Sequence, residues 1–388
     1  MNYIIDTFFT IFTMTLIIFM VPGFAMLEAG LVRTKNVTAV LTVNVMIYAL
    51  ASLAFLLIGY EYAFGSWDHQ DGMSQYAFFM FQMAFVGKVV NIMSGGVSER
   101  SRILPLALFT LLVGAFIYPT IVNITWGANF LAGTAFDISS LSDLAGSTVI
   151  HSTGGWELLA AILIMGSREG RFKNGRIHVI PASNIPLVTL GAFLLWIGWF
   201  GFNGGSVGAI SSKENADAVA LTIMNTNTAG LAGAISGWLL TYFRYKKFDI
   251  TMMLNGALGG LVAVTAGADQ YDIYTPILIG VIGGALVVVA VPLFDKLKMD
   301  DPVGALSVHL VNGIWGTLAL GIFVKNVSLL SQFKGIVVVG LIVFPLSWVS
   351  IYILNKFFTL TATKEEQQQG IDAIECGMEA YPEFKRSI

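Results

Sequence analysis

Residues 143–151 read DLAGSTVIH, and residues 301–309 read DPVGALSVH. Both stretches follow the pattern Asp-x7-His with glycine at the fourth position, and they lie 158 residues apart (301 − 143, and likewise 309 − 151). The two histidines, His151 and His309, lie in strongly apolar segments. A titratable side chain in such a segment is costly and usually faces a cavity or a pathway. We therefore expect an internal repeat whose two histidines share one site.

The composition indicates a polytopic membrane protein. Of the 388 residues, 56% are hydrophobic and only 12% are charged, a balance typical of chains with many membrane spans. Forty-one glycines suit close packing of helices in lipid. The single cysteine, Cys376, excludes an internal disulfide and a cysteine-based metal cluster. The formal net charge of −3 identifies no partner, and we expect no metal, no cofactor and no nucleic-acid partner.

Eleven segments are apolar and long enough to cross a bilayer, which needs about 20 residues. They fall near residues 8–28, 40–64, 78–97, 103–121, 145–166, 185–205, 217–242, 250–267, 274–294, 303–323 and 333–357. The first has no basic leader and no small-residue cleavage site, so we interpret it as a retained helix.

Charged loops orient these spans. One set of loops carries Arg33, Lys35, Arg100, Arg102, Arg168, Arg171, Lys173, Arg176, Arg244, Lys246, Lys247, Lys296 and Lys298, and the opposite set carries Lys213, Lys325 and Lys334. Because basic loops stay in the cytoplasm, we expect the N-terminus outside and the C-terminus in the cytoplasm of a cell (plasma or inner) membrane.

The position of the two histidines predicts an inverted repeat. His151 lies in the fifth span and His309 in the tenth. Since five is odd, the second copy enters the membrane upside down, a recurring plan for transporters with a site near the midplane. We thus predict an all-α polytopic protein. Its expected parts are repeats of about 8–166 and 185–323, an eleventh helix at 333–357, a transmembrane domain over 1–357 and a cytoplasmic C-terminal tail over 358–388.

Several ordered motifs resemble the ammonium transporter family (Amt/Mep, with the Rh proteins as relatives). Besides the two Asp-x7-His stretches they are GFAMLEAGLVRTKN from Gly23, FQMAF from Phe81, TWGANF around Trp126, IGWFGFNGGS up to Ser206 and LNGALGGLVAVTAG from Leu254. The resemblance covers nearly the whole chain. It implies ammonium uptake by a homotrimer in membrane lipid, with a pore through each eleven-helix subunit. Trp126 and Ser206 favour the Amt branch over Rh.

The resemblance implies an outer recruitment site at Trp126, Phe81 and Ser206. This set suits NH4+, because a small cation that leaves water needs π faces and an acceptor. Aromatic faces attract cations by roughly 0.5–2 kcal/mol. The alternative for Trp126 is an ordinary aromatic residue at the membrane interface.

A phenylalanine gate is implied beneath this site. Phe85 and Phe202 match the two rings that close the family's pore, and a hydrophobic constriction blocks hydrated ions. Phe81 and Phe85 are four residues apart, so they share one helix face. In a chain with 28 phenylalanines, packing alone is the alternative role for any one of them.

The matching pore residues of the family are two histidines in contact, here His151 and His309. Neutral imidazole carries one donor and one acceptor, so a pair can share and relay a proton. The implied mechanism deprotonates NH4+ near the outer site and passes NH3 and H+ separately. The alternative is a structural role for each buried histidine.

Two aspartates support the histidines in the family pattern. The carboxylate matching Asp143 orders backbone near the outer vestibule without binding the substrate directly. Asp301, beside Asp300 at the start of the tenth span, is at least as well explained as a helix cap as by a role in conduction.

Lys88 departs from the family pattern, which has an uncharged stretch there. Residues 81, 85 and 88 follow i, i+4, i+7 spacing, so Lys88 should share the pore-facing side of its span. There a cation would repel NH4+, replace it, or be neutralised by desolvation. The alternative is a structural pair on a neighbouring helix, with Glu28 and Glu157 as candidate partners.

The tail resembles the family's regulatory tail, which packs under the trimer, couples subunits and helps nitrogen-regulatory PII proteins plug the cytoplasmic exits. Gly370, Gly377 and Tyr381 fit its spacing. Three functions follow: an ammonium transporter; an ammonium sensor that binds NH4+ but conducts it poorly because of Lys88; and an intramembrane enzyme using His151 and Asp143 as an acid–base pair. No metal-ligand triad, nucleophile motif or phosphate-binding loop supports the enzyme.

Overall fold

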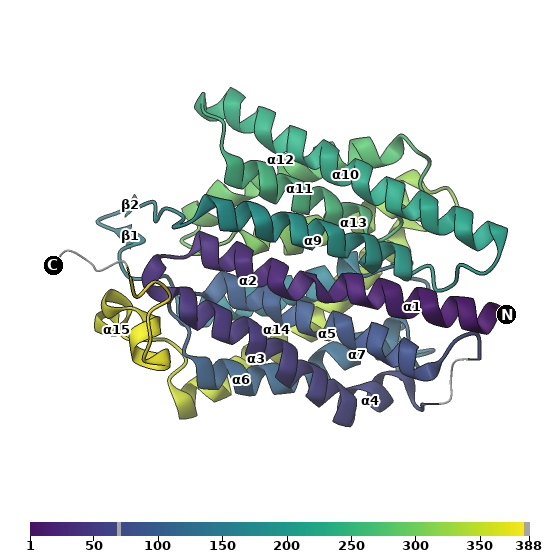
Figure 1. Ribbon diagram of the computed structural model, residues 1–388, viewed down its shortest axis with the longest axis horizontal. Coiled ribbons are helices and arrows are strands. Elements are labelled where there is room, and N and C mark those ends of the chain that lie inside the picture. The colour runs from purple at the N-terminus through teal and green to yellow at the C-terminus, as the bar shows by residue number, and fades with distance from the viewer. Residues whose placement is uncertain (68–70, 384–388) are drawn as a thin grey trace.

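The computed structural model describes residues 1–67 and 71–383, and helices dominate it. Helices are expected, because lipid offers no partner to an unpaired backbone N–H or C=O. The long helices run roughly side by side, and the N-terminus lies at the opposite end of the molecule from the tail helix α15 (Lys364–Gln369) (Figure 1).

The remaining helices are α1 (Asn2–Ile18), α2 (Met20–Leu31), α3 (Val37–Ala54), α4 (Tyr60–Phe64), α5 (Gln75–Val97), α6 (Ile103–Leu112), α7 (Tyr118–Thr125), α8 (Thr153–Met165), α9 (Ile185–Gly205), α10 (Lys213–Tyr245), α11 (Ile250–Val264), α12 (Thr275–Lys296), α13 (Asn312–Phe323) and α14 (Leu329–Phe358). Short helical turns are η1 (Thr34–Asn36), which is 3-10, and the π-helical η2 (Phe55–Gly59), η3 (Val113–Ile117), η4 (Ser147–Ser152), η5 (Leu306–Val311) and η6 (Asp372–Cys376). Strands β1 (Phe172–Lys173) and β2 (Arg176–Ile177) form a small antiparallel hairpin.

Ten helical stretches in the described part of the chain are long and apolar enough to span a membrane. They coincide with ten of the eleven predicted segments. The remaining segment, 250–267, corresponds to α11, which has 15 residues. At 1.5 Å per residue this helix covers about 22 Å, less than the roughly 30 Å hydrocarbon core of a bilayer.

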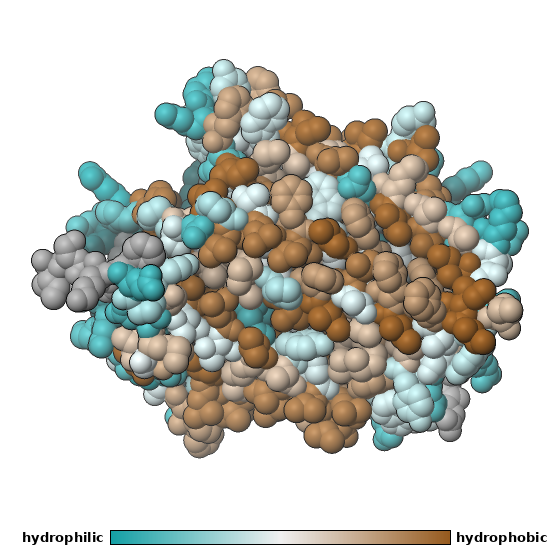
Figure 2. Space-filling model, in the orientation of Figure 1, coloured by the Kyte–Doolittle hydropathy of each residue, from teal (hydrophilic) through white to brown (hydrophobic). Residues whose placement is uncertain are grey.

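The surface has the polarity of a membrane-embedded body. Figure 2 shows hydrophobic residues across the middle of one face, and hydrophilic residues gathered mainly towards its two ends. Large apolar side chains such as Phe8, Leu57 and Leu330 are exposed. Exposing so much continuous apolar surface to water would be unfavourable, whereas lipid acyl chains solvate it.

Glycines allow α10, α11 and α12 to pack backbone against backbone. A Cβ on Gly280 of α12 would lie 2.2 Å from the carbonyl oxygen of Ala229 on α10, and one on Gly233 would lie 2.3 Å from that of Gly256 on α11. Even alanine would separate these helices. This is the small-residue packing that membrane helices use in place of a hydrophobic driving force.

Both Asp-x7-His stretches fold into the same local structure, a π-helical turn that follows a glycine with positive φ. Gly146 has φ +108° and precedes η4, whereas Gly304 has φ +80° and lies two residues before η5. Glycine accepts this conformation at little cost. The histidines are therefore held by broken helices, which are frequent at functional sites.

The two aspartates cap these turns. The Asp143 carboxylate accepts hydrogen bonds from the N–H groups of Gly146, Ser147, Thr148 and Val149 at 2.8–3.0 Å. The Asp301 carboxylate accepts from those of Val303, Gly304 and Leu306 at 2.7–3.3 Å. Both carboxylates thus satisfy N–H groups that a helix start leaves unpaired. For Asp301 this is the capping geometry that was one of its two predicted roles.

A buried ionic cluster joins the loops at the tail end of the molecule. Arg168 donates to both carboxylate oxygens of Asp300 and to Glu99, each at 2.8 Å, and Arg33 also pairs with Glu99. Burial alone would raise the pKa of Asp300, but hydrogen bonds and charge from Arg168 outweigh it and hold the pKa at about 2. Some of the arginines that orient the spans therefore also hold the loops together.

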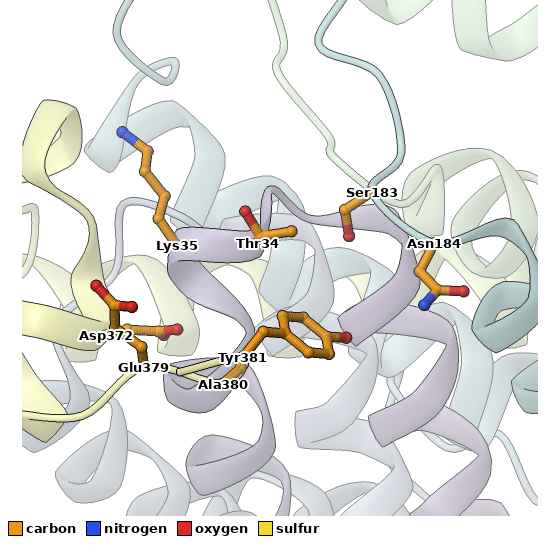
Figure 3. Close-up of a pocket in the computed structure, with 8 residues that line it drawn as sticks. All are labelled: Thr34, Lys35, Ser183, Asn184, Asp372, Glu379, Ala380 and Tyr381. Atoms are coloured by element: carbon orange, nitrogen blue, oxygen red, sulfur yellow. The ribbon is translucent and has the colours of Figure 1, made fainter. Parts of the chain in front are cut away.

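The tail is attached to the same end. Arg102 pairs with Glu366 and Glu375 of the tail, and the Asp372 carboxylate accepts from the N–H groups of Thr38 and Ala39 at the start of α3. A pocket of about 280 Å³ separates the tail from the loops before α3 and α9, and Figure 3 shows the Tyr381 ring directed toward its Asn184 side.

Candidate functional site

A cavity of about 330 Å³ opens at the end of the molecule opposite the tail. The predicted recruitment residues Trp126, Phe81 and Ser206 all line it. Trp126 Nε1 donates to the carbonyl oxygen of Asp143 at 3.0 Å, which holds the indole in place. Ser206 Oγ donates to the carbonyl oxygen of Phe202 at 2.8 Å. The hydroxyl oxygen of Ser206 thus keeps its lone pairs for another donor.

Gln82, which is not among the predicted site residues, also lines this cavity. Its Oε1 is buried and has no hydrogen-bond partner among the described residues. A buried carbonyl without a donor is costly, so the cavity offers a second acceptor beside Ser206. The only signal in the sequence was its place inside the FQMAF motif, one residue after Phe81.

Two buried rings lie at the inner side of this cavity, and one of them, Phe85, lines it. Phe85 and Phe202 meet edge to face, with ring centroids 4.6 Å apart and an interplanar angle of 87°. Phe81 packs on Phe85 in the same manner, at 4.9 Å and 84°. Edge-to-face pairs are favourable contacts for aromatic rings. The structure therefore brings the predicted gate residues together directly beneath the predicted recruitment residues.

His151 and His309 lie beneath the gate and contact each other. Their Nδ1 atoms are 3.2 Å apart, and the rings are stacked at 5.2 Å. The His151 ring also stacks on Phe202, at 5.5 Å. In a neutral pair, one Nδ1 is protonated and donates a hydrogen bond to the other Nδ1, which is unprotonated. The accepting ring therefore carries its own proton on Nε2. One outward-facing Nε2 is then a donor and the other an acceptor.

A smaller cavity of about 20 Å³ continues on the other side of the histidines. It is lined by His309, Phe24, Glu28, Asn91, Asn255 and Val308, among others. Such a volume holds about one water molecule. The outer cavity, the two rings, the histidine pair and this inner cavity follow one another in that order through the bundle.

Asp143 supports this arrangement from outside the span. Its carboxylate accepts hydrogen bonds from the four N–H groups at the start of η4, and its backbone carbonyl oxygen accepts one from the Trp126 indole. Burial raises the pKa of its carboxyl above the ordinary value, although the four N–H donors act in the opposite direction. One residue thus orders both the recruitment aromatic and the first histidine turn.

The structure places Lys88 beside this line of cavities. Its side chain is buried, and Nζ lies 5.8 Å from the ring centroid of Tyr48 on α3. Within the described residues, Nζ has no hydrogen-bond partner, and no ion pair joins it to Glu28 or Glu157. Along α5 it lies between the gate residue Phe85 and Asn91 of the inner cavity, but it lines neither cavity.

A bundle of helices long and apolar enough to span a membrane, with an aromatic pair and a histidine pair between two cavities, is typical of membrane transport proteins. The model of the Ammonium Transporter Family matches residues 8–381. The chain is 33% identical over 398 residues to a putative ammonium transporter of Synechocystis sp. (97% of this chain, 89% of the relative). It is 33% identical over 408 residues to the ammonium transporter Amt2 of Archaeoglobus fulgidus (95% and 86%).

A solved structure named "Sensor Amt Protein" superimposes with a TM-score of 0.88 at 31% identity, covering 96% of this chain and 98% of the other. The chain therefore belongs to the ammonium transporter family. This is a family of multi-pass membrane transport proteins for ammonium rather than of enzymes.

Proposed function

We propose that this protein takes up ammonium through the line of cavities described above, by recruiting NH4+, deprotonating it and passing it along the twin histidines. The observation that carries the proposal is the 3.2 Å contact between His151 and His309, directly beneath the Phe85–Phe202 pair and between two cavities. A purely structural pair would need no cavity on either side.

Recruitment follows from the chemistry of the outer cavity. NH4+ has four donors and loses a large hydration energy on leaving water, so it needs acceptors and π faces. Ser206 Oγ and Gln82 Oε1 supply the acceptors, and Trp126 and Phe81 supply the faces. Each desolvated cation–π contact contributes up to about 2 kcal/mol.

Deprotonation then allows passage of the gate. The Phe85–Phe202 contact offers no polar atom to a hydrated cation, whereas neutral NH3 needs none. The reaction is NH4+ → NH3 + H+, in which an N–H bond breaks and the proton goes to an acceptor in the pathway. The acceptor Nε2 of the histidine pair can receive a hydrogen bond from the nitrogen that follows.

The architecture that we propose has eleven membrane helices, α11 included, as an inverted five-helix repeat plus α14, with the N-terminus outside. The two Asp-capped π-helical turns support the repeat. The ionic cluster and basic loops at the tail end support a cytoplasmic C-terminus.

We also propose a homotrimer whose tail, residues 358–388, is regulatory and accepts a PII-type protein. The contacts of the tail with Arg102 and with the start of α3 support regulation, because a partner that moves the tail must disturb loops at the inner end of the pathway.

A second candidate function is ammonium sensing with poor conduction. Lys88 favours it, because its buried amine has no hydrogen-bond partner within the described residues and lies along α5 between the gate and the inner cavity. A charged amine there would repel NH4+. The likeness to the Sensor Amt Protein favours it as well.

Ammonium-evoked current in proteoliposomes decides between the two. Wild type, Lys88→Ala and the isosteric Lys88→Met are compared with His151→Ala. A saturable wild-type current that His151→Ala abolishes supports transport. No wild-type current, with current gained in both Lys88 variants, supports the sensor. Current that persists in folded His151→Ala removes the twin-histidine mechanism.

A further inference from the structure

Glu28 on α2 lines two separate cavities. One is the inner cavity that it shares with His309 and Asn91. The other, also of about 20 Å³, lies toward the tail and is lined by residues that include Asn36, Ser98 and Glu99. Among the described residues, no other side chain lines both. Glu28 itself is 1% exposed, so it separates two water-sized spaces rather than facing bulk solvent.

The position of Glu28 on α2 brings it close to the histidine pair. The ring of Phe24 lies 6.3 Å from that of His309. Glu28 follows four residues later, so it lies on the same helix face about one turn, or 5–6 Å, nearer the tail. The inner cavity thus connects a histidine at one end with a carboxylate at the other.

The two oxygens of the Glu28 carboxylate differ in their partners. Oε2 accepts a hydrogen bond from Asn44 Nδ2 at 3.0 Å, and Asn44 Oδ1 in turn accepts from Asn91 at 2.7 Å. Oε1 has no partner among the described residues. A Cβ on Gly95 would lie 3.1 Å from Oε1, so the glycine leaves room beside it. One oxygen is held in place while the other remains an unused acceptor.

We propose that Glu28 is the proton acceptor at the inner end of the pathway: it takes the proton that ammonium has released and gives it to the second cavity, while ammonia continues from the inner cavity. The inference rests on the transport function proposed above. The carboxylate becomes a carboxylic acid when it binds H+ and returns to the carboxylate when it releases H+ to water. No other reactant is consumed.

The surroundings suit this role. His309 and Glu99 are the titratable groups that share a cavity with Glu28, and Glu99 is already neutralised by Arg33 and Arg168. Lys88 lies over Tyr48 and forms no ion pair with Glu28. With no cation fixed to it in the described structure, the Glu28 carboxyl can change its charge without breaking an ion pair.

One residue of the tail borders the second cavity. Ile371 lines it, and the Ile371 N–H donates to Asn36 Oδ1 at 2.9 Å. Proton release by this route therefore requires water to pass beside the tail, whereas the inner cavity is lined by residues of α2, α5, α9, α11 and η5 and by none of the tail. The two products of deprotonation would leave the protein at different places.

The test uses Glu28→Gln in proteoliposomes, with ammonium-evoked current and lumenal pH recorded together. Glutamine keeps the volume and the acceptor for Asn44 but cannot carry a proton. Glu157→Gln is the matched control, since Glu157 is 0% exposed and lines neither cavity. We expect Glu28→Gln to lower the current at least about tenfold, since acid–base groups commonly contribute 10²- to 10⁴-fold. Because ammonia then enters without its proton, the lumen of Glu28→Gln vesicles should become more alkaline than that of wild type, and faster than that of protein-free vesicles. Glu157→Gln should behave as wild type.

Glu28→Asp separates proton transfer from structure. Aspartate keeps a titratable carboxyl but reaches Asn44 less well than glutamine does. Proton transfer therefore predicts more current in Glu28→Asp than in Glu28→Gln, and a structural role predicts the reverse order, which would overturn the proposal. Wild-type current in Glu28→Gln, or neither current nor alkalinisation in that variant, would overturn it as well. If wild type itself gives no current, the transport function fails, and this inference fails with it.

Infrared difference spectra give a second measurement if Glu28→Gln does not fold. An ammonium-induced carboxyl band should appear in wild type, shift in Glu28→Asp and persist unshifted in Glu157→Gln. A band that follows Glu157 instead would overturn the assignment.

Discussion

Removing Arg168 should destabilise the protein by about 3 kcal/mol, because it leaves two buried carboxylates short of a cation. The Arg168 side chain is 4% exposed, and its partners Glu99 and Asp300 are 0% and 1% exposed. Arg168→Met keeps most of the volume while it removes three charge-assisted hydrogen bonds of 2.8 Å.

The magnitude follows from what the carboxylates retain. Removing one partner of a buried ion pair typically lowers the free energy of unfolding by about 3–5 kcal/mol. After the change, Glu99 keeps Arg33 at 3.0 Å and Asp300 keeps Arg171 at 3.6 Å. Because each carboxylate keeps one cationic partner, the lower end of that range applies.

Arg102→Met is the matched control. Arg102 also pairs with two carboxylates, Glu366 and Glu375, but its side chain is 25% exposed. Partly solvated pairs contribute about 1 kcal/mol or less. We therefore expect a small loss of global stability, together with faster proteolysis of the released tail.

The assay is the free energy of unfolding in mixed micelles of detergent and SDS, followed by tryptophan fluorescence. Arg168→Met should lie about 2 kcal/mol below Arg102→Met, the difference between the two values above. Equal losses, within about 0.5 kcal/mol, would refute the argument from burial.

Other predictions address the pathway and its supports. Trp126→Leu should raise the half-saturating ammonium concentration about 2- to 30-fold with the maximal current kept, since it removes a cation–π face of roughly 0.5–2 kcal/mol; an equal loss at all concentrations would count against recruitment. His151→Ala should abolish selective current but leave the oligomer folded on size exclusion, whereas an unfolded variant would favour a structural histidine. Asp143→Asn should lower stability by about 1–3 kcal/mol, because an NH2 group, which is a donor, replaces one of the two oxygens that accept four N–H groups, and a melting point equal to wild type would contradict that. Because the pKa of Asp300 is lowered from 3.8 to about 2, its stabilisation is present above pH 4 and lost as the pH falls through about 2; Asp300→Asn should flatten this part of a pH–stability curve.

Much of the fold could be predicted because lipid leaves few choices. Apolar runs of about 20 residues must be helices there, so ten predicted spans coincide with observed ones. The segment 250–267 shows the limit, because composition cannot tell where α11 stops: Thr265 and the turn after it are as apolar in character as the helix. The place of each histidine followed from repeat spacing, which also predicted that the pair would meet.

Side-chain directions were harder to predict. Heptad-like spacing put Lys88 on the face of Phe81 and Phe85, but a long flexible chain can reach a neighbouring helix, and its amine lies over Tyr48. The sequence indicates Glu28 only as a candidate partner for that lysine. Its position between two cavities depends on α3, α5 and the tail meeting in space, which no local pattern in the sequence encodes.

Because η4 and η5 are π-helical, the number of residues in each turn sets how the histidine rings are aligned. A π turn holds one residue more than the α-helix it interrupts, and one residue corresponds to a rotation of about 100°. A single deletion within η4 would therefore turn His151 away from His309 without removing either side chain. Conversely, inserting one residue into a regular α-helix rotates the following side chains by about 100°, which can turn one of them toward the pathway. Point-substitution scans cannot detect such a determinant, whereas libraries of single-residue deletions can.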